Sequence, residues 1–355
     1  MQDEVQIKRF ELQERDALFA FLREVYADNL RHSDEKFWRW HYCEVPGASE
    51  SNIPLWVAKD GDEVVGQLGA IPVTLNVDRK DVPAVWILDL MIRIDYRRHG
   101  LAKRLVTAIN EKYPVMLGVN THEQKSPELL ESLGWKITGN IRRYSKIINP
   151  GNATKEVTKI PALRSIVNSL YGVFRRPYPE NTAIRPIEKF DEHFDELTSE
   201  AESQWKNSAK RSAEFLRWQY AGQPGKKFDI FGYYDGDRLR GYMVMFIRKP
   251  DENGVISKAA ISDIYYSADE AREIVDALLK AAINLAAERK VGSVVIDILD
   301  PLVEARLKHL GFWQVKSPLL LMVKSESDQD LLYNIDNWFV TRGDSDTSIF
   351  EKPNI

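Results

Sequence analysis

A basic turn between an apolar stretch and an amphipathic stretch is the part of this sequence best suited to bind an anion. The letters RRHG at 97–100 follow the apolar run 84–94 and precede aliphatic residues at helical spacing, which predicts a helix over 98–112. The first amides of a helix lack partners within the helix and carry the positive end of its dipole, so they can bind a phosphate. Gly100 would let the backbone approach the ligand, and the two arginines would add charge. A solvated basic helix cap with an incidental glycine is the alternative.

Two stretches of the chain carry the same features in the same order, which indicates a duplicated domain. Trp40 and Trp218 each follow an arginine in a helix-like segment, and a Leu-Gly-aromatic triplet recurs at 133–135 and 310–312. The separation between the tryptophan and the glycine differs by one position in the two stretches. An Asp-Gly-Asp sequence in each stretch suits the tight turn of a hairpin.

Each half mixes predicted strands and helices, so the fold class is α/β or α+β. In the first half we predict strands over 84–94, 115–119 and 135–147 and helices over 98–112 and 126–132. In the second we predict strands over 226–234, 238–248, 258–266, 293–299 and 312–323 and a helix over 269–290. The expected domains are 1–149, a linker with a helix over 150–183, a second domain over 184–325 and a tail over 326–355.

The composition limits the partners and the compartment. Lys and Arg number 49 against 53 Asp and Glu, a formal charge of −4, so no nucleic-acid-binding surface is expected and a small molecule is the default partner. The single cysteine, Cys43, cannot form a disulfide within the chain and fits a reducing compartment. No apolar stretch approaches membrane-spanning length and the amino terminus has no apolar leader, so we expect a cytoplasmic protein without a membrane span. The histidines show no metal-ligand spacing, so no metal is expected.

The turn resembles the pyrophosphate loop of the GNAT acyltransferase superfamily, which reads (Arg or Gln)-x-x-Gly-x-(Gly or Ala). The letters RRHGLA at 97–102 match this motif at a strand-to-helix junction, and LGW at 133–135 lies where these proteins commonly have Leu-Gly-Phe. The resemblance covers residues 1–148 well and 184–324 as a weaker second copy. It implies two tandem GNAT-like domains, each a mixed, largely antiparallel sheet flanked by helices.

The resemblance also implies acetyl-CoA or another acyl-CoA as the donor. In GNAT proteins the backbone of the strand before the loop holds the pantetheine, and the loop with the first helical residues holds the pyrophosphate. The corresponding residues here are, for the strand, Met91, Ile92 and Arg93, and for the loop, Arg97, Arg98, His99, Gly100, Leu101 and Ala102.

The second copy differs at this point. Its corresponding segment carries Asp269, Glu270 and Glu273 and has no glycine. Acidic side chains suit a helix start but would repel a pyrophosphate. We therefore expect only the first copy to bind CoA, while the second supports the structure or shapes the acceptor cleft.

The reaction implied by the resemblance is attack of a neutral amine on a thioester, which needs a base. The candidates are Asp89, in the strand before the loop, and the neighbours His122 and Glu123, after the strand 115–119. A structural anchor is the alternative for Asp89, because the second copy has Asp263 in the same context. An exposed loop pair is the alternative for His122 and Glu123.

Other groups are less suited to proton transfer. His41 lies among aromatic residues, which is typical of a packed helix histidine, and Tyr144 on the last strand could donate a proton or be a core aromatic residue. The position where many GNAT proteins have a general-acid tyrosine is Leu130, so that group is missing.

Three functions agree with these features. The first is an acetyl-CoA-dependent N-acyltransferase acting on a primary amine. The Arg-Trp helix and the letters WFVTRGDSD near the end resemble large GNAT proteins of bacterial surface-polysaccharide synthesis, which implies an amino sugar, nucleotide-linked, as acceptor. The second is acyl transfer to a small thiol precursor or a peptide amine, as in the mycothiol synthases and Fem-type transferases. The third is a CoA-binding regulatory protein without turnover.

Overall fold

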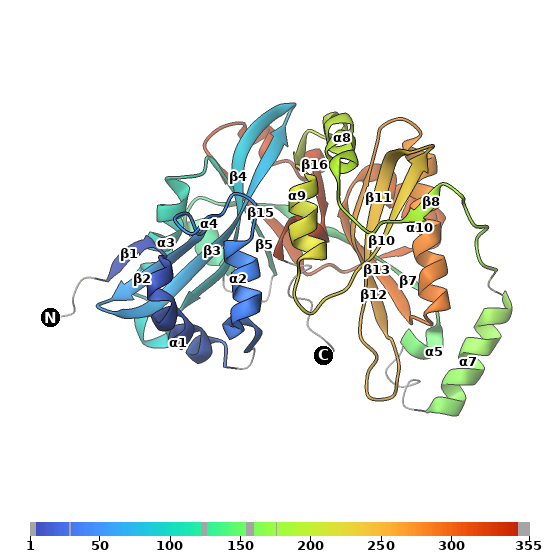
Figure 1. Ribbon diagram of the computed structural model, residues 1–355, viewed down its shortest axis with the longest axis horizontal. Helices are drawn as coiled ribbons and strands as arrows, with labels where there is room; N and C mark the ends of the chain where they lie inside the picture. The colour runs from blue at the N-terminus through green and yellow to red at the C-terminus, as the bar shows by residue number, and fades with distance from the viewer. Residues whose placement is uncertain (1–4, 28–29, 122–125, 154–159, 175, 347–355) are drawn as a thin grey trace. The chain divides into compact units, whose positions relative to one another are not determined.

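The chain folds into two compact units that are interlaced in sequence (Figure 1). The computed structural model describes residues 5–27, 30–121, 126–153, 160–174 and 176–346. Unit 1 consists of Met1–Gly139, Glu214–Lys226 and Leu320–Asn334. Unit 2 consists of Asn140–Ala213, Lys227–Leu319 and Ile335–Ile355.

Unit 1 is built on a mixed, mostly antiparallel sheet with the strand order β6-β15-β5-β4-β3-β2-β1. Its strands are β1 (Gln6–Arg9), β2 (Leu55–Asp60), β3 (Glu63–Val77), β4 (Lys80–Ile92), β5 (Val115–Thr121), β6 (Lys136–Asn140) and β15 (Leu319–Ser325). Gly61, with φ of 57°, forms the tip of the β2–β3 hairpin, which confirms the turn predicted at Asp-Gly-Asp. β4 and β5 pair in parallel.

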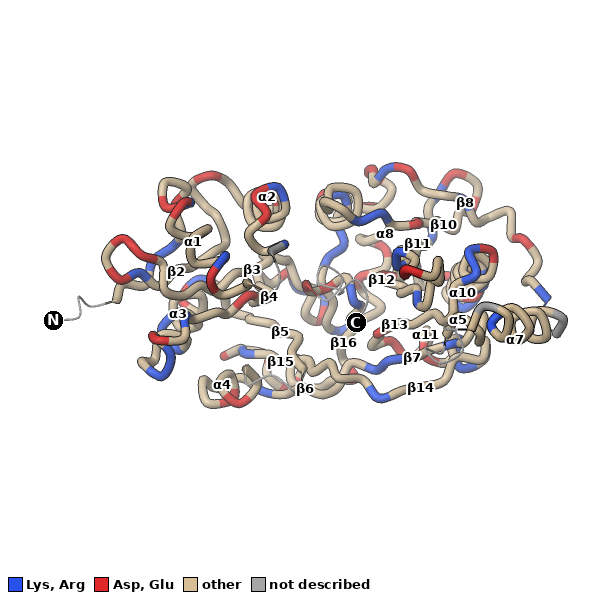
Figure 2. Tube along the Cα trace, turned by 90° about the horizontal axis from the view of Figure 1, so that it is seen from below, with Lys and Arg blue, Asp and Glu red and all other residues tan. Residues whose placement is uncertain are grey.

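Helices cover both faces of the unit 1 sheet. They are α1 (Arg15–Val25), α2 (Glu35–Cys43), α3 (Leu101–Asn110) and α4 (Ser126–Ser132). The Asp34 carboxylate accepts the Phe37 amide at 2.8 Å and so caps the start of α2. Figure 2 shows α1 and α2 on one face of strands β2 to β4 and α3 on the other. Leu101, Leu105 and Ile109 are buried at helical spacing and anchor α3 to the core.

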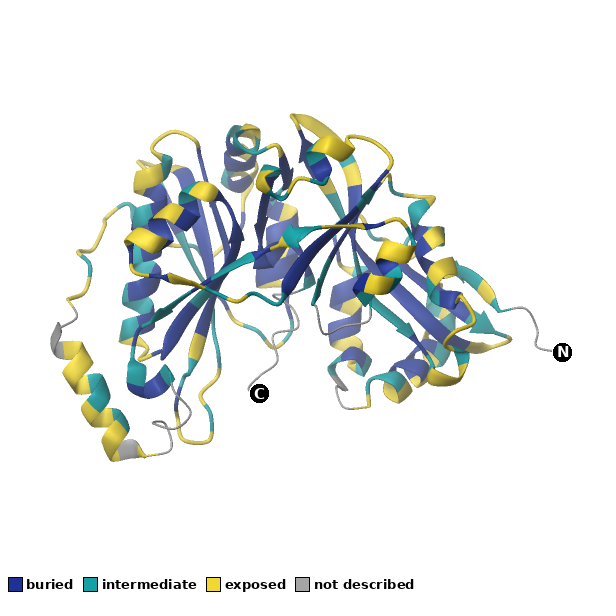
Figure 3. Cartoon of the chain, turned by 180° about the vertical axis from the view of Figure 1, so that it is seen from behind, coloured by how far each residue is buried: buried dark blue, intermediate teal, exposed yellow. Residues whose placement is uncertain are grey.

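The core of unit 1 joins the central strands to α3 and α4. Its largest side chains are those of Trp56 and Trp135, and Met322 of β15 belongs to the same cluster. Figure 3 shows the strands mostly buried and the outer faces of the helices exposed. Burial of these apolar side chains holds α3, and hence the turn that precedes it, against the end of β4.

Unit 2 repeats the arrangement with additions. Its strands are β7 (Arg142–Ile147), β8 (Ile184–Pro186), β9 (Asn207–Ala209), β10 (Asp229–Asp235), β11 (Arg238–Ile247), β12 (Lys258–Tyr266), β13 (Ser293–Leu299), β14 (Trp313–Val315) and β16 (Trp338–Thr341). Its main helices are α7 (Pro161–Phe174), α8 (Glu192–Ala201), α10 (Ala271–Glu288) and α11 (Pro301–His309). By the repeat, β12, β13 and α10 are the counterparts of β4, β5 and α3.

The last strand of each predicted domain is divided between the units. The stretch 135–147, predicted as one strand, breaks at Ile141 into β6 and β7, and 312–323 breaks before Pro318 into β14 and β15. β7 pairs with β13 and β14 in unit 2, whereas β15 lies between β5 and β6 in unit 1. Sequence alternation predicts that a strand exists but not which sheet edge it joins, so the continuous ranges 1–149 and 184–325 differ from the observed units.

None of the described helices has both the length and the apolar character needed to cross a membrane. Within the same described residues, no three side chains of His, Cys, Asp or Glu are grouped as a metal site would require.

Candidate active site

The first feature of the site is a separation of two parallel strands. In the described part of the chain, pairing between β4 and β5 ends at Trp86 and Leu117, although β4 continues to Ile92 and β5 to Thr121. The edge of β4 beyond Trp86 is therefore open to an extended ligand that lies between the strands and bonds to the backbone.

A bulge interrupts β4 beside this opening. Between the paired residues Gln67–Met91 and Gly69–Leu88, β4 has one residue more than β3. Asp89 lies in the bulge with φ of 52°, a left-handed backbone that aspartate tolerates better than most residues. The bulge therefore sets the direction of the Asp89 side chain, and no local pattern of residues predicts it.

The Asp89 carboxylate lies in a cluster of aromatic polar groups. The Tyr42 hydroxyl donates to Oδ2 at 2.6 Å, and the Tyr26 hydroxyl lies 3.3 Å from Oδ1. His32 Nδ1 lies 3.8 Å from Oδ1, and the Asp89 side chain is 9% exposed. The carboxylate is thus held by two phenol hydroxyls, and an imidazole lies within ion-pair distance of it.

Burial lowers the pKa of two histidines in this region. The His32 and Tyr26 rings stack with centroids 3.9 Å apart and an interplanar angle of 9°. Burial lowers the pKa of His32, and the Asp89 carboxylate partly opposes that shift. Burial likewise lowers the pKa of His41 to about 4. His41 is therefore a packed helix histidine, as predicted, and is neutral at physiological pH.

A glycine in the neighbouring strand makes room for Tyr42. A Cβ at Gly69 would lie 2.6 Å from the Tyr42 hydroxyl oxygen and 2.7 Å from Cε1. Such distances are far below van der Waals contact, so any side chain at Gly69 would displace the phenol from Asp89.

The turn before α3 has the backbone geometry of an anion site. Arg98 and Gly100 have φ of 70° and 74°, and Gly100 is the N-cap of α3 without a capping side chain. A Cβ at Gly100 would have no atom within 4 Å, so the space over the turn is open. The first amides of α3, starting at Leu101 and Ala102, therefore face outward with the positive end of the helix dipole.

The predicted donor-binding residues divide into three groups. Arg98 and His99 are exposed beside the turn, while Leu101 is buried and can contribute only its backbone. Arg97 is exposed, but its Nε donates to the Ile92 carbonyl at 3.1 Å, so part of its guanidinium braces the turn. Met91 and Ile92 remain at the end of β4.

Arg93 is the third strand residue predicted to hold the pantetheine. Its amide donates to the Val65 carbonyl at 2.9 Å and its carbonyl accepts the Tyr96 amide at 3.0 Å. Its side chain forms ion pairs with Glu63 and Asp95. These groups are already engaged within the protein, and the part of Arg93 in holding the pantetheine stays a prediction.

The other predicted base candidates cannot be assessed in the same way. His122 and Glu123 lie outside the described residues. Just before them, the Asn120 side chain accepts a hydrogen bond from the Ser126 hydroxyl at 2.8 Å. Leu130, at the position of the general-acid tyrosine, is buried in the unit 1 core. Its side chain is a hydrocarbon and cannot donate a proton.

Tyr144 belongs to unit 2 and is engaged there. Its hydroxyl donates to Glu304 Oε2 at 2.8 Å, and Arg142 holds the other Glu304 oxygen at 2.8 Å. Burial and the Glu304 hydrogen bond raise the pKa of Tyr144. It is thus a buried structural residue, the core-aromatic alternative.

The second copy lacks both features of the donor site. Glu270 is the N-cap residue of α10 with φ of 56°, and Glu273 lies in the first turn. The pairing of β12 with β13 ends at Ile261 and Ile296 among the described residues, as that of β4 with β5 ends in unit 1. The strand edge beyond this point, however, is occupied.

Strand β16 fills that edge. Ile298 of β13 pairs with Arg142 of β7 and also with Thr341 of β16, so β7 and β16 lie on opposite edges of β13. Since β7 occupies one edge along the strand, β16 takes the edge that β12 leaves. The space equivalent to the open β4 edge is therefore closed by the chain's own residues 338–341.

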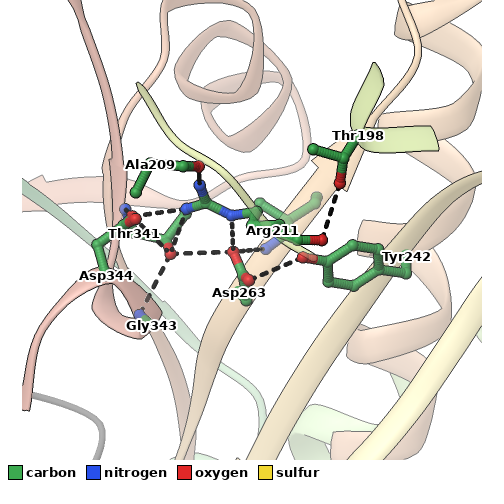
Figure 4. Close-up of polar contacts among 9 residues, drawn as sticks. Thr198, Ala209, Arg211, Tyr242, Asp263, Thr341, Gly343 and Asp344 are labelled. Carbon is green, nitrogen blue, oxygen red and sulfur yellow. Dashed lines mark hydrogen bonds and ion pairs between the residues drawn. The ribbon is translucent and has the colours of Figure 1, made fainter. Parts of the chain in front are cut away.

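The counterpart of Asp89 is locked in an ion-pair network (Figure 4). Arg211 is fully buried, and its guanidinium contacts Asp263 Oδ1 at 3.3 Å and Asp344 Oδ2 at 2.6 Å. The hydroxyls of Thr341 and Tyr242 donate to Asp263 at 2.9 and 3.0 Å. In this copy the aspartate is a structural anchor, which separates its role from the environment of Asp89.

Sequence reasoning missed three residues that contact Asp89. Tyr26, His32 and Tyr42 come from the helical region 15–43, and no periodic pattern links them to β4. The sequence signal that could have pointed to these partners is the aspartate present in both copies, Asp89 and Asp263. A buried carboxylate in each copy needs hydrogen-bond partners in each.

Comparisons with known proteins relate part of the chain to one family. The family described as an acetyltransferase (GNAT) domain matches residues 6–137. Human N-acetyltransferase 8 is 33% identical over 100 residues, which make up 26% of this chain and 42% of that protein. The chain thus spans less than half the length of this relative.

Two solved structures share the fold of the whole chain. N-myristoyltransferase of Saccharomyces cerevisiae with bound myristoyl-CoA superposes with a TM-score of 0.58 at 14% identity, covering 91% of this chain and 83% of that one. A GCN5-related N-acetyltransferase of Anabaena variabilis superposes with a TM-score of 0.62 at 13% identity, covering 94% and 74%. Residues 6–137 therefore match an acetyltransferase domain of the GNAT type, and the chain as a whole shares the fold of these two solved structures.

Proposed function

We propose that this protein is an acyl-CoA-dependent N-acyltransferase with one donor site, in unit 1, and that acetyl-CoA is the donor. One observation carries the proposal. The bulge of β4 places a hydrogen-bonded carboxylate, Asp89, on the same strand that opens away from β5 and runs into the left-handed turn before α3. In unit 2 the equivalent edge is filled and the equivalent turn is acidic.

The donor would be held mainly by backbone groups. The pantetheine arm would bond to the open edge of β4 at Met91 and Ile92, and the pyrophosphate to the amides of residues 98–102. Arg98 and His99, both exposed, would add positive charge at the turn. The donor supplies the thioester carbonyl that is attacked.

Asp89 would act as the base. The amine must lose its proton to attack, and the carboxylate is placed to accept it directly or through a water molecule. The new C–N bond forms as the C–S bond breaks, and the thiolate leaves with the sulfur electron pair. Tyr42 and Tyr26 would fix the orientation of the carboxylate, and the His32 imidazole lies 3.8 Å from it.

The acceptor class is a finer proposal. A primary amine is expected from the superfamily, and an amino sugar, nucleotide-linked, is the candidate that the sequence resemblance supports. A small thiol precursor and a peptide amine are the competing acceptors.

The test is release of free CoA thiol from acetyl-CoA in the presence of a panel of amines. The panel contains UDP- and dTDP-linked amino sugars, cysteine-containing amines and short peptides. Release with at least one amine, lost in Asp89→Asn, supports the proposal. Binding of acetyl-CoA without release on any amine would instead favour the CoA-binding regulatory function, to which the buried Leu130 lends some weight.

A further inference from the structure

A basic pocket in unit 2 lies apart from the residues assigned to the donor. It has a volume of about 310 Å³ and is lined by Arg143, Ser145, Arg248, Lys258, Ala259, Ala260, Val295, Val315, Lys316 and Arg342. Five of these side chains are cationic and none is acidic. All of them belong to unit 2, and no role has been given to the pocket so far.

The floor of the pocket is formed by small side chains in one row across three strands. Ser145 of β7 pairs with Val295 of β13, which pairs with Ala260 of β12. Directly paired residues project from the same face of a sheet, so the three side chains lie next to one another. Because all three are short, they leave space between the longer side chains around them.

Long basic side chains surround this floor. Lys258 lies two residues before Ala260 in β12, where it pairs with Ser293 of β13. The Arg248 amide donates to the Lys258 carbonyl at 3.2 Å. On the other side Val315 pairs with Arg143, and Lys316 is the next residue along the chain. The β-sheet register itself therefore brings the cations together from distant parts of the sequence.

One buried carboxylate offsets part of the charge. Asp297 is fully buried, and its oxygens contact Arg143 Nε at 2.7 Å and Arg342 Nε at 2.8 Å. It therefore fixes two guanidiniums at the pocket but supplies only one negative charge between them. Among the described residues, neither Arg248 nor Lys316 has an ion-pair partner, so these two positive charges are uncompensated.

Such an arrangement matches a compact polyanion. Like charges gathered around one pocket repel one another, and a bound anion relieves the repulsion. Guanidiniums bind phosphate oxygens through paired, charge-assisted hydrogen bonds. A monocarboxylate would neutralise only one of the cations, whereas a phosphate or diphosphate group neutralises two or more and fits the volume. We propose that this pocket binds the phosphate or diphosphate group of a small-molecule ligand.

The experiment uses the full chain and sodium pyrophosphate as the probe. It is done in an Arg97→Glu plus Gly100→Asp background, so that the α3 turn cannot account for binding. Thermal unfolding is followed as pyrophosphate replaces sodium chloride at constant ionic strength. We expect a saturable rise in Tm, because a ligand that binds only the folded state stabilises it.

Two pairs of substitutions locate the binding. Arg248→Gln plus Lys316→Gln should weaken pyrophosphate binding by about tenfold or more, since it removes two charge-assisted contacts. Lys189→Gln plus Lys227→Gln makes the same change of charge at exposed positions of unit 2 outside the pocket and should leave binding unchanged. Lys316→Glu alone, at an exposed site, should act in the same direction as the first pair.

The outcomes separate this proposal from the proposed function. No rise in Tm beyond the chloride control, or an equal rise in the pocket and control variants, would overturn the pocket assignment. Because neither CoA nor an intact donor turn is used, failure here leaves the donor site untouched, and failure of the donor site leaves this result untouched.

Discussion

The indoles of Trp40 and Trp218 stack and exchange hydrogen bonds. Trp40 Nε1 donates to the Trp218 carbonyl at 2.8 Å, and Trp218 Nε1 donates to the Trp40 carbonyl at 2.9 Å. Their ring centroids lie 5.2 Å apart with an interplanar angle of 16°. The two residues are equivalent positions of the duplicated sequence, and both lie in unit 1. Each indole donates to the other residue's carbonyl, so the two equivalent residues of the repeat form a reciprocal, two-fold contact.

This pair should contribute measurably to stability. Trp218→Phe removes one indole donor and leaves the buried Trp40 carbonyl without it, so we expect a loss of about 1–3 kcal/mol in the free energy of unfolding. Trp40→Phe should cost a similar amount. In a double-mutant cycle by urea denaturation the combined loss should be smaller than the sum of the two. Strictly additive losses would show that the two contacts are independent.

Asp89→Asn should separate chemistry from donor binding. The amide keeps the size of the side chain but cannot accept the amine proton, so kcat should fall by roughly 10²- to 10⁴-fold. Stabilisation by acetyl-CoA should stay unchanged, because the donor binds through backbone groups. The matched control is Asp263→Asn, in which the same change falls on the ion pair with Arg211. It should lower Tm while leaving kcat per folded molecule near wild type, and the reverse pattern would refute the assignment of the base.

Part of this site follows from the sequence and part does not. The turn at 97–102 could be placed because its signals are local: an apolar strand, a glycine and a helical period in adjacent residues. The surroundings of Asp89 could not, because a bulge depends on register with β3 and because Tyr26, His32 and Tyr42 approach it only in the folded chain.

The same distinction explains the fold. The repeat and most strands were predictable, since alternation and turn residues lie within each element. The exchange of β7 and β15 between units was not, because both alternatives bury the same apolar residues against a sheet edge. Arg93 illustrates the limit for single residues, since its amide and side chain turned out to be engaged by β3 and nearby carboxylates.

Gly69→Ala should displace Tyr42, the hydrogen-bond partner of Asp89, without changing Asp89 itself. The added methyl group would lie 2.6 Å from the Tyr42 hydroxyl, so we expect a loss of about 1–3 kcal/mol from overpacking together with a lower kcat. In a Tyr42→Ala background the same glycine change should cost much less stability. Thermal unfolding and initial rates check both effects, and an equal cost in the two backgrounds would argue against a Tyr42 clash.

Arg211→Met should make the stability of the protein depend on pH in a particular direction. Burial raises the pKa of Asp344, and Arg211 opposes that shift. Without the arginine two carboxylates are left buried without their cation, and we expect a loss of about 3–5 kcal/mol near neutral pH.

Protonation of the buried carboxyl sets the direction in which stability changes with pH. A carboxyl with a raised pKa in the folded state binds its proton more tightly there, so stability falls as pH rises through that pKa. Removal of Arg211 strengthens this effect. Denaturant melts should therefore show a smaller deficit for Arg211→Met near pH 4 than near pH 7, and a deficit that grows on acidification would contradict the assignment.

His41 should contribute to acid sensitivity. Its pKa falls from 6.5 to about 4 through burial, so the unfolded chain gains a proton between these values while the folded chain does not. Stability is present above pH 6.5 and is lost as pH falls toward 4, by roughly 3 kcal/mol for a shift of this size. His41→Phe should remove most of this loss in melts across the window, apart from a share from His32. The exposed His309→Gln is the control and should leave the pH dependence as it is in the wild type.

The central claim is that the backbone at the start of α3 binds the donor and that its counterpart at α10 does not. Hydrogen–deuterium exchange with and without acetyl-CoA tests it directly, because it reports amide by amide. We predict protection of the amides in residues 98–102 and at the end of β4, none in residues 269–273, and loss of protection in Arg97→Glu plus Gly100→Asp but not in Glu270→Arg. Protection at 269–273, or none in either turn, would contradict the account.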